Sequence, residues 1–234
     1  MSADLPAPDG PVTSVAGAIA RMKAIEATLP AGDGIACFNR MYLDVTSQVY
    51  SELGQGFYAD PAFMSELDVM FANLYFEAAD VAANPAAAPL AWRPLMERRN
   101  AAGIESIQFA LAGMNAHINH DLPLAMVRTC IALNTSPEAG QHSADYEKVD
   151  QLLDAAEQSI RQSFESAAEL AADRRLSAVA TLTCNWTINT ARDLAWNNTL
   201  LLWAVRHDPI ATGLVLECLA ASTALASRML LVAV

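Results

Sequence analysis

Apolar side chains recur with the 3.6-residue period of an α-helix along almost the entire chain. The clearest case is Ala62–Ala83, where one helical face carries Phe63, Leu67, Met70, Leu74, Ala78 and Val81. Asp60 and Pro61 precede this segment, and these residue types favour the N-cap and the first position of a helix. No pair of segments has the pattern expected of paired strands. The sequence therefore predicts an all-α protein.

Short polar or proline-containing segments separate the expected helices. These helices are Val12–Leu29, Ile35–Leu53, Ala62–Ala83, Pro94–Arg99, Ala101–His120, a short one ending at Leu133, Asp145–Ala172, Leu176–His207 and a last one from Pro209. The chain has 234 residues, of which 53% are hydrophobic, and this suffices for one sizeable core. We expect a flexible N-terminal arm at residues 1–11. Residues 12–234 should form a single helical bundle of six to seven main helices.

The charge balance limits the classes of partner. Lys and Arg total 14 against 26 Asp and Glu, so the net charge is −12, which disfavours nucleic acid and anionic membranes. The most apolar segments, Leu176–Ala191 and Leu214–Val234, are short or interrupted by polar residues, so we expect buried core helices and no membrane span. No basic residue precedes Arg21, which disfavours a signal peptide. The expected location is the cytoplasm.

A cluster of polar residues lies near the end of the Ala101–His120 helix. His117, His120 and Asp121 fall on one flank of its apolar stripe, and Ala110 and Gly113 precede them on that flank. These small side chains would leave room for a ligand. Imidazole and carboxylate groups suit a Zn²⁺ or Fe²⁺ ion, and they equally suit an acid–base pair. The structural alternative is a stabilising hydrogen bond near a helix end.

Glu77 is the second candidate, because it lies at the edge of an apolar stripe among aromatic residues. We expect it to be at least partly buried, and a buried carboxylate requires a cation, a metal or a proton. An ion pair with Arg192 is the structural interpretation. The metal interpretation assigns one Zn or Fe ion to His117, His120, Asp121 and Glu77.

A stripe of polar and aromatic residues follows the Leu176–His207 helix. It contains the four candidate substrate-binding residues Asn185, Asn189, Arg192 and Trp196. Apolar area with a few polar groups is typical of a pocket wall, although a polar seam between helices would have the same pattern. Arg192 should be buried and paired with Glu77, with Asp121 or with an anionic ligand.

Several segments resemble a family of uncharacterised bacterial proteins that is described as a domain of unknown function. They are AGMNAHINHDLPLA at residues 112–125, FNRMYLDVT at 38–46, DPAFMSELDVMFANLYF at 60–76, and the later residues Trp186, Ala191, Arg192, Asp193 and Trp196. The similarity covers most of the chain from about Phe38 onward. It implies a soluble single-domain protein and no particular activity.

Three functions are compatible with these residues. The first is an enzyme for a small, partly apolar molecule, with His117, Asp121 and Glu77 as the catalytic residues. Its chemistry would be hydrolysis by a metal-activated water, metal-free acid–base catalysis or iron-dependent oxidation. The second is a non-catalytic binding protein for an apolar ligand. The third is a structural helical bundle with a polar core.

Overall fold

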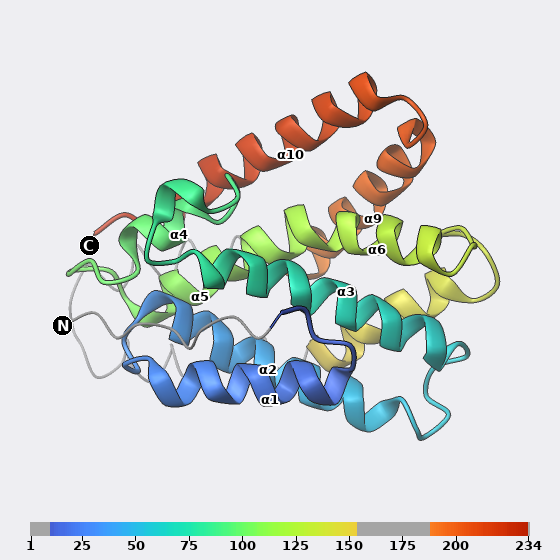
Figure 1. Cartoon of the computed structure of the whole chain (residues 1–234), viewed down its shortest axis with the longest axis horizontal. Helices are drawn as coiled ribbons and strands as arrows, with labels where there is room; N and C mark the ends of the chain where they lie inside the picture. The colour runs from blue at the N-terminus through green and yellow to red at the C-terminus, as the bar shows by residue number, and fades with distance from the viewer. Residues whose placement is uncertain (1–9, 154–187, 234) are drawn as a thin grey trace.

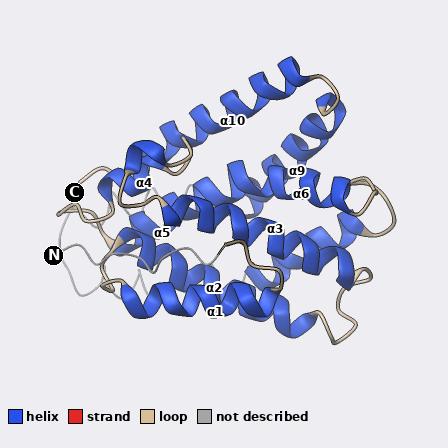
Figure 2. Ribbon diagram, viewed as in Figure 1, coloured by secondary structure: helices blue, strands red, loops and turns tan. Residues whose placement is uncertain are grey.

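The computed structural model describes residues 10–153 and 188–233, and these residues form an all-α, single-domain fold with no strand among them (Figures 1 and 2). The elements are α1 (Val15–Thr28), α2 (Gly34–Glu52), α3 (Pro61–Asp80), the 3₁₀ turn η1 (Pro85–Ala87), α4 (Arg93–Arg98), α5 (Ser106–Ala116), the π-helical turn η2 (His117–Asp121), α6 (Leu122–Ala132), α9 (Ile188–Val205) and α10 (Pro209–Leu230). Residues 142–153 are also helical.

Most of the expected helices agree with these elements to within a few residues, but the helix expected from Ala101 begins five residues later, at Ser106. The predicted cap at Asp60 is present. The Asp60 side chain accepts a hydrogen bond from the Phe63 amide at the start of α3. Asp208 caps α10 in the same way, through the amides of Ile210 and Ala211. The helices expected at 145–172 and 176–207 extend beyond the described residues, as does most of the expected N-terminal arm. The described residues 145–153 and 188–205 of these two helices are helical.

The continuous rod of α5, η2 and α6 runs through the centre of the bundle (Figure 1). Helix α2 packs against both α1 and α5, while α3 and α9 pack against α6. The core lies between these helices, and its largest fully buried side chains include Trp92, Tyr75 and Phe38. Helix α10 rests on α5 and diverges from the bundle toward its own N-terminal end.

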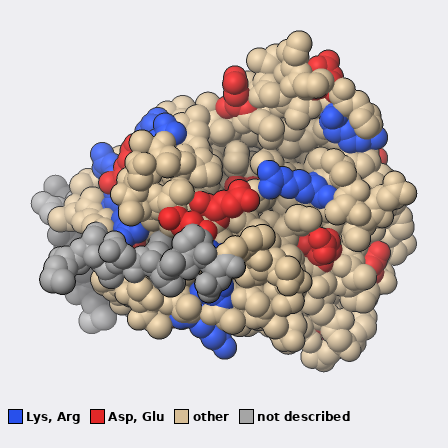
Figure 3. All heavy atoms as spheres, in the orientation of Figure 1, with Lys and Arg blue, Asp and Glu red and all other residues tan. Residues whose placement is uncertain are grey.

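Helix α10 differs from the expectation that the apolar run of residues 214–234 is a buried core helix. Its buried residues are Thr223, Ala224, Ser227 and Leu230, whereas Leu214 and Met229 are about 60% exposed. The reason is that α10 carries apolar residues on every face, while α5 covers only one face of its C-terminal half. Figure 3 shows α10 as a largely uncharged surface. By length and composition alone, α10 could cross a membrane. One such helix is weak evidence for a membrane span.

Candidate functional site

The polar cluster predicted from the sequence lies on the π-helical turn η2. Here the Leu122 amide donates to the carbonyl of His117, five residues earlier. The sequence predicted that the helix stops before Pro123, and this is wrong, because the rod continues through α6. In a regular α-helix the Pro123 ring would clash with the carbonyl of Asn119. The wider π turn lies where that clash would occur, and π turns are frequently associated with functional sites.

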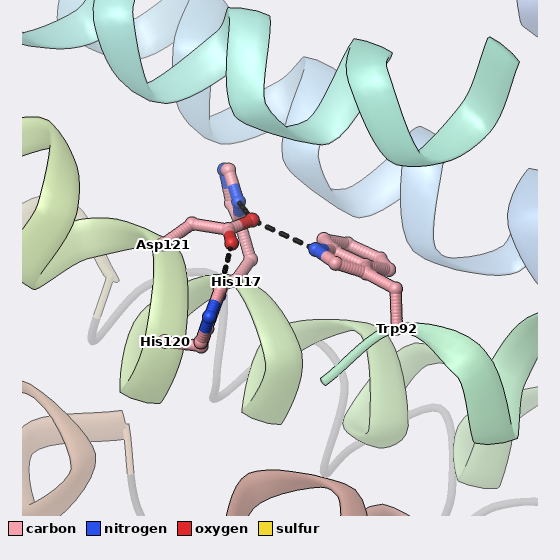
Figure 4. A network of polar contacts seen from close by, with 4 residues as sticks. All are labelled: Trp92, His117, His120 and Asp121. Carbon is pink, nitrogen blue, oxygen red and sulfur yellow. Dashed lines mark hydrogen bonds and ion pairs between the residues drawn. The ribbon is translucent and has the colours of Figure 1, made fainter. Parts of the chain in front are cut away.

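The carboxylate of Asp121 accepts three side-chain hydrogen bonds, as Figure 4 shows. Trp92 Nε1 lies 2.8 Å from Oδ2, His117 Nδ1 lies 3.0 Å from the same oxygen, and His120 Nδ1 lies 2.7 Å from Oδ1. Burial alone would raise the pKa of this carboxyl, but the hydrogen bonds from His117 and His120 outweigh burial and hold the pKa below its usual value. Asp121 is therefore ionised at neutral pH, and both Nδ1 atoms donate to it.

His117 is a neutral imidazole, and one of its ring nitrogens has no hydrogen-bond partner among the described residues. Burial lowers its pKa, and the hydrogen bond to Asp121 opposes this only in part. Because Nδ1 carries the proton, Nε2 has a free lone pair, and this buried atom has no hydrogen-bond partner among the described residues. The ring stacks on Phe71 at 3.5 Å between centroids and meets Tyr42 edge-on at 4.5 Å. The orientation of Nε2 is therefore fixed.

His117 lines a cavity of about 90 Å³ between α2, α3, η2, α9 and the helix at 142–153. Most of its described lining is aliphatic, aromatic or Met, and the side chains with polar atoms are Tyr42, Asp68, His117, Tyr146 and Arg192. The Tyr146 hydroxyl donates to the Arg192 carbonyl, and the Arg192 guanidinium pairs with Asp150. Tyr42, Asp68 and His117 each have a buried polar atom without a partner in the described part of the chain.

Sequence reasoning missed Asp68. Burial raises the pKa of its carboxyl to about 7. The available signal was its helical spacing from Met64, Phe71 and Tyr75, which places a carboxylate on an aromatic face of α3.

Glu77 does not join this site, so the predicted convergence of Glu77, His117 and Asp121 is wrong. Its side chain is exposed near the end of α3, where water solvates the carboxylate and no partner is required. The space expected above Gly113 is also filled, because a Cβ there would lie 2.5 Å from Cγ of Phe38. The rings of Phe38 and His117 are in edge contact.

The four predicted metal ligands likewise do not converge on one point: His117, His120 and Asp121 are in hydrogen-bond contact, but Glu77 is exposed and does not join them. Within residues 10–153 and 188–233, no group of three His, Cys, Asp or Glu side chains could hold a metal ion. The physical reason is that His117 and His120 both direct Nδ1 at the two oxygens of Asp121, rather than at a common point in space. This geometry supports the acid–base interpretation of the cluster.

The four predicted substrate-binding residues do not share one environment, and of them only Arg192 is among the described lining residues of the cavity. Arg192 is buried and paired, as predicted, but its partner is Asp150 rather than Glu77 or Asp121, and its guanidinium lies 4.0 Å from the Tyr146 ring centroid. Trp196 packs on Tyr146 outside the cavity lining. Asn189 is exposed, and Asn185 lies outside the described residues.

Replacing Arg192 with Met should destabilise the protein by about 1–3 kcal/mol, a discounted value because the Asp150 side chain is 28% exposed. The control is Arg40→Met, which breaks a pair with Glu26 whose side chains are 48% and 37% exposed and should cost about 0–1 kcal/mol. Urea unfolding of both variants measures this difference. Equal stabilities would mean that the Arg192 pair contributes no more than a surface pair.

Comparisons with known proteins supply a family and no activity. No curated protein and no solved structure matches the chain. A family model matches residues 15–233, which include every described residue of α1 to α10 and the His117–Asp121 turn. The chain therefore belongs to the family described as "Family of unknown function (DUF5995)".

Proposed function

We propose that the protein is an acid–base enzyme for a small, largely apolar molecule, in which His117 is the general base and Asp121 orients it. The observation that carries this proposal is the buried Nε2 of a neutral His117, which has no partner among the described residues and belongs to a side chain lining an apolar cavity. A general base needs this free lone pair within hydrogen-bond reach of the bound substrate.

The neighbouring groups determine how the proton moves. Nε2 takes a proton from the substrate or from a water held against it, and the imidazolium that forms is stabilised by the ionised Asp121 behind Nδ1. Trp92 and His120 fix the carboxylate, so it cannot turn away from His117. The apolar walls keep the local dielectric constant low, which strengthens the Asp121–imidazolium interaction. In the final step Nε2 returns the proton to the product.

A binding protein remains the second candidate, and the composition of the cavity favours it. Among the described residues the lining contains no Ser, Thr or Cys side chain that could act as a covalent nucleophile. In this case His117 and Tyr42 only supply hydrogen bonds to an apolar ligand.

The test follows isotope incorporation from solvent into a panel of small esters, amides, ketones and amines with short apolar bodies. Mass spectrometry detects ¹⁸O from labelled water after hydrolysis and deuterium from D₂O after proton abstraction. His117→Gln should reduce the rate by about 10²–10⁴-fold, which is the usual contribution of a general base. His207→Gln, a change at an exposed position outside the cavity, should leave it unchanged.

Two results would contradict the proposal that the protein is an enzyme. A folded His117→Gln variant as active as the wild type would remove His117 from the chemistry. Tight binding of a panel compound that the wild type never converts would support the binding protein instead.

A further inference from the structure

We propose that the cavity binds a small apolar amine with its ammonium group on Asp68, so that the substrate on which His117 acts belongs to this chemical class. The inference rests on the proposed function for the role of His117. The amine site itself depends on other residues and can be tested separately.

The first observation is a group of buried polar atoms around Asp68 that lack partners within the described residues. They are Asp68 Oδ2 and the Tyr42 hydroxyl, whose side chains line the cavity, and the Tyr58 hydroxyl, whose side chain lies outside the lining. Burial, followed by the charge of Asp68, raises the pKa of both tyrosine hydroxyls, which places Tyr42 and Tyr58 near this carboxylate. Because nearly all buried polar atoms in native proteins are paired, this group of oxygens is suited to a ligand that donates several hydrogen bonds. An ammonium group donates three.

The second observation is the sign of the charge around the cavity. Asp68 and Arg192 are the described lining residues other than His117 that can carry charge at neutral pH, and the guanidinium of Arg192 is engaged by Asp150. The ionised Asp121 lies directly behind His117. The described surroundings therefore hold two carboxylates, Asp68 and Asp121, against one cation that is already paired. This balance favours a cationic ligand over a neutral or anionic one.

The third observation is the aromatic and apolar character of the same walls. The rings of Tyr42 and Phe71 line the cavity beside Asp68, and aromatic faces attract ammonium groups. The cavity volume of about 90 Å³ is below the roughly 150 Å³ of a cavity that admits benzene. The apolar body of the ligand is therefore a short aliphatic chain. His117 lines the same cavity, so a ligand held on Asp68 shares this cavity with the His117 ring.

The probe is n-butylamine, compared with n-butanol and butyrate, which have the same chain and a neutral or anionic end. Isothermal titration calorimetry at pH 8 on the full chain should detect butylamine binding. Asp68→Asn should weaken it by about 10- to 100-fold, the usual effect of losing a charge-assisted hydrogen bond. Glu66→Gln, a change on the same helix outside the cavity lining, should bind like the wild type.

The inference is overturned if butanol binds as tightly as butylamine, if butyrate binds in its place, or if Asp68→Asn keeps the wild-type affinity. A melting curve at pH 8 checks that Asp68→Asn is folded. The outcomes also separate the two proposals. Conversion of ketones or esters that depends on His117, without amine binding, would refute the amine site and leave the enzyme standing. Amine binding that depends on Asp68, without conversion of any compound in the panel, would refute the enzyme and leave the amine site standing.

Discussion

Asp68→Asn should stabilise the protein by up to about 4 kcal/mol above pH 7 and have almost no effect near pH 4. In the folded protein burial raises the pKa of Asp68 to about 7, whereas the unfolded chain has the ordinary value of about 3.9. Between these values the folded state binds more protons than the unfolded state, so this group makes stability fall as pH rises. A pKa difference of one corresponds to about 1.4 kcal/mol, and asparagine removes the whole pH-dependent loss.

Urea unfolding of the wild type and the variant at several pH values between 4 and 8 measures the difference between them. Taking the difference removes the contributions of other titrating groups such as Asp121 and His117. Glu66→Gln is the matched control and should show no gain of this size. A constant difference across the pH range would mean that Asp68 titrates normally and is hydrated in the folded protein.

Asp121→Ala should change the free energy of unfolding in the opposite direction to Asp68→Asn and destabilise the protein by about 3–5 kcal/mol at neutral pH. The change leaves Trp92 Nε1 and His117 Nδ1 buried without an acceptor, and each such donor costs about 1–3 kcal/mol. His120, which is partly buried, adds less because water can reach it. Asp44→Ala provides the control, because Asp44 lies exposed on α2.

Thermal and urea unfolding both report this loss. Asp121→Asn is informative beside it. Its amide oxygen, placed where Oδ2 lies, can still accept from both buried donors, while its amide nitrogen cannot accept from His120, so its stability should fall between Ala and the wild type. If Asp121→Ala is no less stable than Asp44→Ala, the three hydrogen bonds contribute nothing net, and the role of Asp121 in orienting His117 loses its energetic basis.

The helices could be predicted from the sequence because apolar period and capping residues are local signals. Asp60 and Asp208 define helix starts regardless of what packs nearby. Burial is not local in this sense. Helix α10 has apolar residues on all sides, and only the packing of α5 decides which of them are covered. The exposure of Glu77 likewise depends on which helices lie opposite the end of α3.

The candidate site was predictable only in part. His117 and Asp121 are four residues apart on one helix, so the sequence was sufficient to pair them. Trp92 joins them from 29 residues earlier in the chain, and Asp150 meets Arg192 across 42 residues. No periodic pattern encodes such contacts. Asp68 was missed because a single aspartate on an apolar face is identified as unpaired only when all of its neighbours are known.

The π turn also sets the rotational phase of the central rod. One residue of an α-helix accounts for about 100° of rotation, so the additional residue in η2 turns α6 by roughly that angle relative to an uninterrupted helix. The two halves of the rod consequently present different sides to the bundle, α5 to α2 and α10, and α6 to α3 and α9. The residues that hold the His117–Asp121 pair therefore also set how α6 is rotated relative to α5. Deleting one of them would shift the register of every contact that α6 makes.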